Sequence, residues 1–207
     1  MDTNQSWIDW YLSEPRGKYQ VKIDKEYIMN AFNYYGIRQK VNLFSAALEL
    51  MVKNYYQPIN IDEDDKSKQI IIEQQAEMLY GLIHARYLLT NEGLTKMYEK
   101  YINGCFPKCP RKLCKGMTCL PYGVSDELNE YSVKLFCPSC KEIYNMPDNS
   151  MATVDGAYFG PSWVNLFISK YSSLFKNINI EKYVPKIYGF RIQSQFYENH
   201  DEEETLS

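Results

Sequence analysis

Residues 105–119 read CFPKCPRKLCKGMTC, and residues 136–140 read FCPSC. The first stretch holds four of the six cysteines in the chain, and the second holds the other two. A proline directly follows the first cysteine of CPRKLC (residues 109–114) and of CPSC (residues 137–140). Proline fixes φ and favours a turn in which both sulfurs of a loop face one point. The two loops therefore predict one tetrahedral Zn²⁺ site, since paired cysteine loops are typical of structural zinc.

The positions of these prolines also indicate which of the six cysteines are the ligands of this site. The predicted ligands are Cys109, Cys114, Cys137 and Cys140. One alternative that stays open has Cys105 in place of Cys109, and another has Cys119 in place of Cys114. Four protein sulfurs leave no position for water, so we expect one structural, non-catalytic Zn²⁺ per chain. A three-disulfide framework is disfavoured in a reducing compartment, and a redox dithiol is disfavoured because no βαβ pattern surrounds CPSC.

Basic side chains flank the first loop, and they allow two interpretations. A basic zinc ribbon can bind nucleic acid. Four thiolates and one Zn²⁺ also carry a net charge of about −2, which nearby cations offset. The net charge of the whole chain is −3, which favours the second interpretation. These side chains are Lys108, Arg111, Lys112 and Lys115.

The composition is that of a globular protein. The chain has 207 residues, of which 45% are apolar and 24% charged, and its 19 tyrosines indicate large amphipathic contact surfaces. Residues 1–15 lack the basic start and apolar run of a secretory signal. Nothing approaches the roughly 18 consecutive apolar residues of a membrane span. We therefore expect an intracellular protein without membrane contact.

Residues 1–104 show helical periodicity. Asp24 is a candidate N-cap, Gly36 a candidate stop, and Thr90-Asn91 a break or a new N-cap. The predicted helices span residues 25–36, 41–56, 69–88 and 92–101. Between the second and third, INIDEDDKSK is predicted to be a polar connector that carries four consecutive acids, Asp62, Glu63, Asp64 and Asp65.

After Gly104 the pattern changes to turns and short strands, with alternation in YSVKLF (residues 131–136) that predicts a strand. A helix is predicted over residues 162–175, and an extended segment follows in which Gly189 allows a tight turn or a bulge. An acidic tail ends the chain. The predicted fold class is α+β, with an α-helical domain (1–104), a zinc-ribbon domain (105–160), and a C-terminal helix, extended segment and tail (161–207).

Enzyme signatures are missing from the sequence. There are two histidines, and His84 lies in a predicted helix beside its apolar stripe, where a packed or surface histidine is favoured over a catalytic base. No metalloprotease, serine hydrolase, phosphate-loop or kinase motif is present. The chain is therefore predicted to be a binding or scaffolding protein and not an enzyme.

Several stretches together carry a specific resemblance. Over nearly its whole length the chain resembles the regulatory (beta) subunits of casein kinase II. The stretches are SWIDW, EQQAEMLYGLIHARYLLTNEGL, CPRKLC, CPSC, DGAYFG and VPKIYGFRI.

The resemblance implies a non-catalytic subunit that forms a homodimer through its zinc ribbon. The dimer would carry two casein kinase II catalytic (alpha) subunits in a heterotetramer, stabilise them and affect the choice of protein substrates, in the cytoplasm and nucleus. Tyr188 and Phe190 would anchor the catalytic subunit, with Ile187 and Leu166 as lesser contacts. The acidic run from Asp62 to Asp65 would bind polyamines or basic substrate segments.

Some features depart from that family. Near the start only Ser6, with Asp9 three residues on, fits a site for autophosphorylation, whereas members of the family often open with serines followed by acids. The acidic run is short and is followed by Lys66 and Lys68, which weakens the expected polycation binding. The competing hypothesis is a zinc-ribbon transcription or nucleic-acid-binding factor, which predicts steeply salt-dependent binding to DNA or RNA.

Overall fold

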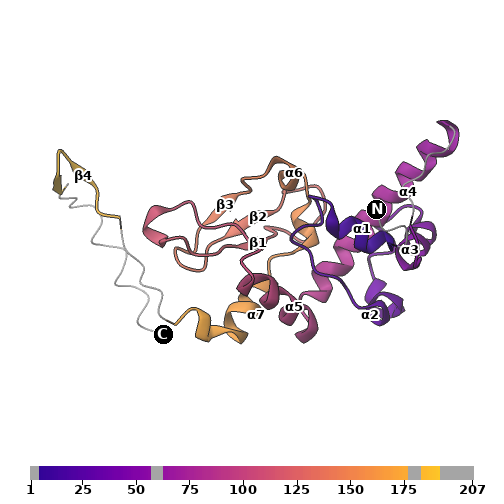
Figure 1. The fold of residues 1–207 in the computed structure, drawn as a ribbon, viewed down its shortest axis with the longest axis horizontal. Coiled ribbons are helices and arrows are strands. Elements are labelled where there is room, and N and C mark those ends of the chain that lie inside the picture. The colour runs from indigo at the N-terminus through magenta and orange to yellow at the C-terminus, as the bar shows by residue number, and fades with distance from the viewer. Residues whose placement is uncertain (1–4, 57–62, 177–182, 192–207) are drawn as a thin grey trace.

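The computed structural model describes residues 5–56, 63–176 and 183–191, and within these the side chains from residue 67 onward in the second range. The fold is α+β, as predicted. Figure 1 shows helices α1 to α4 at one end of the molecule and the sheet β1–β3 beside them, with α5 and α7 below the sheet. The first helices are α1 (Trp7–Ser13), α2 (Lys25–Met29), α3 (Phe44–Val52), α4 (Glu63–Tyr87) and α5 (Asn91–Ile102).

The second half of the chain contains shorter elements. Strands β1 (Leu120–Tyr122), β2 (Lys134–Phe136) and β3 (Ile143–Asn145) form an antiparallel sheet in the order β1-β2-β3. Helices α6 (Asn149–Ala152) and α7 (Trp163–Lys170) follow, and then β4 (Lys186–Ile187) and β5 (Phe190–Arg191) form a hairpin. Within the described ranges, four 3-10 turns connect these elements: η1 (Ala31–Tyr34), η2 (Lys112–Cys114), η3 (Gly156–Tyr158) and η4 (Ser172–Leu174).

The SWIDW stretch supplies the N-cap and the first residues of helix α1. The Ser6 hydroxyl caps the helix by accepting the Asp9 backbone N–H at 3.2 Å. Trp7 and Tyr11 lie one turn apart, and their rings stack at 5.2 Å between centroids. Both side chains are buried against Tyr80 of α4. The short N-terminal helix is therefore held by aromatic packing on α4.

The predicted helix over residues 25–36 is broken in two. Helix α2 ends at Met29, because the Asn30 side chain accepts the Phe32 N–H at 3.1 Å and caps η1 instead. The helix predicted over residues 41–56 is also shorter. It begins at Phe44, since Leu43 has a φ of 53°, and it ends at Val52.

Helix α4 starts earlier than predicted. Its backbone is helical from Glu63, so the polar connector prediction is wrong for residues 63–68, and Asp62 lies outside the described residues. Acids favour the first turn of a helix through its dipole, which explains why this run does not stay a loop. The predicted break after α4 is confirmed: the Thr90 hydroxyl accepts the Gly93 N–H at 3.1 Å and caps α5.

Two of the family-like stretches, EQQAEMLYGLIHARYLLTNEGL and DGAYFG, pack against each other. A Cβ at Gly81 of α4 would lie 2.2 Å from Cγ of Tyr158 in η3, so only glycine allows this approach. Asp155 caps η3 by accepting the Ala157 N–H at 2.9 Å. The buried core is continuous from α1 to α7 across this contact. The proposed boundary near residue 104 therefore stays a prediction.

The predicted strand over residues 131–136 is confirmed in its second half as β2. Val133, Leu135 and Cys137 are buried and alternate with more exposed neighbours, as the pattern predicts. Leu120 pairs with Phe136, and Leu135 pairs with Tyr144. The CPSC loop begins directly after Phe136, the last residue of β2, so the pairing of β2 fixes where this loop starts.

Helix α7 is shorter than the predicted 162–175. It ends at Lys170 and continues as the 3-10 turn η4. Trp163 and Phe167 are fully buried, and the Trp163 indole N–H donates to the Pro121 carbonyl at 3.1 Å. Helix α7 packs beside α5, where the Tyr98 and Tyr171 rings stack at 4.5 Å. Among the described helices, none is both long and apolar enough to cross a membrane.

Candidate metal centre

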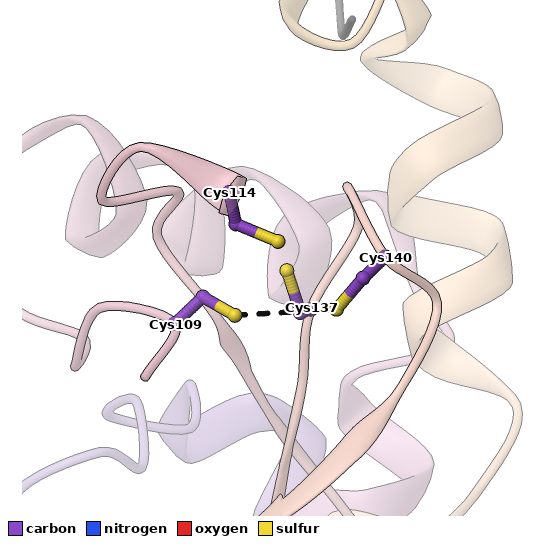
Figure 2. A group of neighbouring side chains, drawn as sticks. All are labelled: Cys109, Cys114, Cys137 and Cys140. Atoms are coloured by element: carbon purple, nitrogen blue, oxygen red, sulfur yellow. Dashed lines mark hydrogen bonds between the residues drawn. The ribbon is translucent and has the colours of Figure 1, made fainter. Parts of the chain in front are cut away.

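Two loops bring four cysteine sulfurs to one point. In Figure 2 the side chains of the four residues converge from the loop before β1 and from the loop after β2. All four Sγ atoms lie within 4.8 Å of one another, and those of Cys109 and Cys140 are 4.0 Å apart. The residues are Cys109, Cys114, Cys137 and Cys140, the four predicted from the prolines.

The two loops have similar backbones. In the first, the Cys109 N–H donates to the Met117 carbonyl at 2.7 Å, and Lys115 has a φ of 51°. In the second, the Cys137 N–H donates to the Glu142 carbonyl at 3.0 Å, and Lys141 has a φ of 58°. In each loop a left-handed residue directly follows the second cysteine. This turn reverses the chain and keeps both sulfurs on its inner side.

The sulfur positions fit a tetrahedral Zn²⁺. A Zn–S distance of about 2.3 Å gives S–S edges of about 3.8 Å. Every observed separation is at most 4.8 Å, so a contraction of about 1 Å or less reaches these edges. The four thiols are free, so no disulfide competes for them. Four soft, convergent sulfur donors are the ligand set that structural zinc prefers.

The cysteine thiols of the centre differ in pKa. Burial raises the pKa of Cys109 and of Cys137. Burial opposes ionisation of Cys140 too, but hydrogen bonds from the Tyr144 hydroxyl, the Glu142 N–H and the thiols of Cys137 and Cys114 together outweigh it and lower its pKa to about 7. Thiolate is the metal-binding form, so Cys140 is the ligand best prepared to capture a cation at neutral pH.

Two basic residues near the first loop make local contacts. The Arg111 guanidinium lies 4.0 Å from Cys114 Sγ, and the Lys108 ammonium donates to the Thr118 hydroxyl at 2.6 Å. The Arg111 contact fits the interpretation in which cations offset the charge of the thiolates.

The remaining two cysteines lie outside the cluster. Cys105 is exposed, and Cys119 is fully buried with a pKa that burial raises to about 12. Neither is grouped with the four sulfurs, so the structure favours the predicted ligand set over both alternatives that substitute them. Cys119 is a buried neutral thiol of low reactivity.

The residues predicted to contact a kinase lie on two elements. Ile187, Tyr188 and Phe190 belong to the β4–β5 hairpin and are 58%, 97% and 77% exposed. Leu166 lies on α7 and is 43% exposed, whereas its neighbour Phe167 is buried. The hairpin turn has positive φ at Tyr188 (51°) and Gly189 (87°), as a type I′ turn requires. Three of the four residues are thus brought together on one exposed ribbon.

The predicted effector residues are only partly described. Asp62 lies outside the described residues, as do the side chains of the other three. The backbone of Glu63, Asp64 and Asp65 forms the first turn of α4.

His84 is a packed residue. Its Nε2 accepts the Val21 N–H at 3.1 Å, and its Nδ1 donates to the Tyr158 carbonyl at 2.7 Å. The ring is fully buried, and this burial lowers its pKa to about 4. Both nitrogens are used to join α4 to the N-terminal segment and to η3. His84 is therefore a structural link, and its ring offers no nitrogen to a substrate.

The buried neutral ring predicts a loss of stability in acid. Unfolded histidine has a pKa of about 6.5, so between pH 6.5 and 4 only the unfolded chain binds this proton. The free energy of unfolding should fall by about 1.4 kcal/mol per pH unit, or about 3 kcal/mol in total. Denaturant unfolding at a series of pH values measures this slope. In His84→Gln the free energy of unfolding should depend less steeply on pH, because only the histidine contribution is removed and any contribution from protonation of the cysteine thiolates remains. Equal slopes in the wild type and in His84→Gln would contradict the assignment of a buried neutral His84.

Sequence reasoning missed one residue of the metal centre. The Tyr144 hydroxyl lies 3.3 Å from Cys140 Sγ. Nothing in the sequence distinguishes it among 19 tyrosines. Only the register of β3 against β2 shows that the residue four positions after Cys140 returns to that sulfur.

Fold and site together define a class: an α+β protein in which a helical part packs on a zinc-ribbon-like four-cysteine centre. A family model described as casein kinase II regulatory subunit matches residues 6–191. The chain belongs to this family of kinase regulatory subunits, and this fits a non-catalytic protein.

Individual relatives agree with the family model. The chain is 40% identical over 188 residues to casein kinase II subunit beta-2 of Neurospora crassa, and the match covers 91% of this chain and 64% of that protein. It is 38% identical over 193 residues to casein kinase II subunit beta of Schizosaccharomyces pombe, covering 93% and 81%. It is 37% identical over 190 residues to putative casein kinase II subunit beta-4 of Arabidopsis thaliana, covering 92% and 66%. The chain thus spans about two thirds to four fifths of the length of these relatives.

Proposed function

We propose that this chain is the non-catalytic regulatory subunit of a casein kinase II-type Ser/Thr protein kinase. It dimerises through its zinc centre, binds and stabilises catalytic subunits, and affects which protein substrates they use. The family match carries this proposal, because it includes the cysteine loops and the exposed hairpin in one alignment over residues 6–191.

Zn²⁺ fits the proposal as a structural cofactor, one ion per chain. When bound, the ion would cross-link the loops before β1 and after β2 and supply no reaction chemistry, since all four ligands come from the protein. The residues that would hold it are Cys109, Cys114, Cys137 and Cys140.

The surface around the centre supports a dimer interface. Ile143, on β3 and paired with Phe136 directly before Cys137, is 46% exposed. A groove of about 600 Å³ beside the first loop is lined in part by Leu113, Met117 and Leu174. Exposed apolar side chains beside a rigid metal-bound loop are suited to burial against a second copy.

The hairpin β4–β5 supports the kinase contact. Ile187 and Phe190 are directly paired, so their side chains lie on the same face of the ribbon. Tyr188 occupies a left-handed turn position that favours Asn or Gly, so turn geometry does not explain an aromatic residue there. A preorganised turn with exposed aromatic side chains is a favourable anchor, because little entropy is lost on binding.

The acidic run from Asp62 to Asp65 is proposed to attract polyamines or basic substrate segments. This attraction is electrostatic and should weaken with salt. In a titration with spermine, replacement of these residues by Asn and Gln should reduce affinity at low salt and flatten its salt dependence. Equal affinities for the wild type and this variant would refute the assignment.

The proposed function has a direct test. The full chain should co-elute in gel filtration with a casein kinase II catalytic subunit and should not co-elute with the catalytic domain of an unrelated Ser/Thr kinase. Separate elution from both kinases would contradict the proposal. Steeply salt-dependent binding to random duplex DNA, in the absence of kinase binding, would favour the nucleic-acid hypothesis instead.

A further inference from the structure

One ligand of the metal centre is less protected than the others. Cys109, Cys114 and Cys137 are buried, whereas Cys140 is only half-buried. Loss of structural zinc begins when one thiolate leaves the ion and is replaced by a proton, by water or by a competing ligand. In this centre the accessible thiolate is that of Cys140, so whatever stabilises this thiolate should govern retention of the ion.

Tyr144 is placed to do this. Its hydroxyl lies 3.3 Å from Cys140 Sγ, within the range of a hydrogen bond to sulfur. Tyr144 is half-buried in β3 and pairs with Leu135, which is 2% exposed. The register therefore fixes the backbone of Tyr144 at the level of the CPSC loop. A phenol has one proton to donate, and a thiolate is an acceptor only, so the direction of the bond is determined once the thiol is ionised.

We propose that the Tyr144 hydroxyl donates a hydrogen bond to the Cys140 thiolate and thereby slows the loss of zinc from the centre. This inference rests on the proposed zinc site and adds a positioning residue to it. The bond adds a polar contact to the sulfur of Cys140, the least buried of the four ligands, and so opposes its departure from the ion. Removal of an outer hydrogen-bond partner of a metal ligand typically costs 10- to 100-fold in metal affinity.

Tyr144→Phe tests the proposal, since it removes only the hydroxyl. Zinc-loaded full-length protein is mixed with a chromogenic chelator, and the rate of zinc release is measured. We expect release about 10- to 100-fold faster than from the wild type, with one zinc per chain still bound at saturation. In the Co²⁺-substituted protein the sulfur-to-cobalt charge-transfer bands should shift, because the hydrogen bond changes electron density on one ligand.

Tyr122→Phe is the matched control. Tyr122 lies in β1 of the same sheet, is also half-buried and packs on Phe136. Within the described residues, the contact found for its side chain is this ring contact, and the hydroxyl is not directed at a cysteine sulfur. This variant should release zinc at the wild-type rate and keep its Co²⁺ spectrum.

The outcomes separate the two proposals. If Tyr144→Phe binds one zinc and releases it as slowly as Tyr122→Phe, the role of Tyr144 is refuted and the zinc site stands. If the wild-type chain takes up no zinc, the zinc site is refuted, and the role of Tyr144 is refuted with it.

Discussion

Replacement of Cys137 by Ser is expected to abolish zinc binding and dimerisation together. Cys137 is fully buried at the end of β2, and its sulfur is one of the four convergent donors. Structural zinc contributes roughly 10–16 kcal/mol of apparent binding energy in small zinc domains, which is comparable to the whole stability of a typical domain. Ser is nearly isosteric but is a poor zinc ligand. Elemental analysis should therefore show no zinc, and the mass in solution should fall from twice 24.4 kDa to 24.4 kDa.

Cys105→Ser is the control for this prediction. Cys105 is exposed and lies outside the cluster, so this variant should retain one zinc per chain and remain a dimer. Partial proteolysis would locate the damage in Cys137→Ser, where new cleavages are expected within the two cysteine loops. A variant that stays dimeric without zinc would show that the metal centre does not build the interface.

The double variant Tyr188→Ala with Phe190→Ala is expected to abolish kinase association without affecting the dimer. These aromatic side chains are 97% and 77% exposed at the tip of the β4–β5 hairpin, so their loss removes no core packing. Anchors of this kind typically contribute about 2 kcal/mol or more each, which corresponds to at least about a 30-fold weaker complex for either single variant. Calorimetric titration with the catalytic subunit measures the effect, and the zinc content should stay at one per chain.

Two further variants separate side-chain contacts from turn geometry. Tyr188→Asn keeps the left-handed turn, since Asn favours type I′ positions, and should still weaken binding about as much as Tyr188→Ala. Tyr183→Ala removes another exposed aromatic side chain, 73% exposed, outside the paired strands and should change little. An unchanged affinity in the double variant would place the kinase contact elsewhere on the molecule.

The sequence was most informative where local chemistry determines structure. Cysteine spacing and the prolines after Cys109 and Cys137 were sufficient to select the four sulfurs that converge. Thr90 before Asn91 predicted the cap of α5, and Gly189 predicted the tight turn of the hairpin. The cap and the turn each depend on interactions between residues only a few positions apart. The two cysteine loops are distant in sequence, but a shared metal requires the same local turn in both, so each loop carries its own signal.

Features that depend on distant contacts were not predictable in this way. The Tyr158 ring packs on Gly81, and its carbonyl accepts the His84 N–H across 74 residues. Neither contact has a local signal. The break at Asn30 was missed because an apolar pattern continued through it, and the side-chain cap prevailed over that pattern. The early start of α4 was missed because consecutive acids are typical of loops as well as of helix N-termini.

Native mass spectrometry of the full chain, with and without a casein kinase II catalytic subunit, tests the central claim most directly. Alone, the chain should have a mass of twice 24.4 kDa plus two zinc ions. With the catalytic subunit, it should shift to a complex of two regulatory chains, two catalytic chains and two zinc ions. A zinc-free monomer whose mass does not change when the catalytic subunit is added would contradict the account.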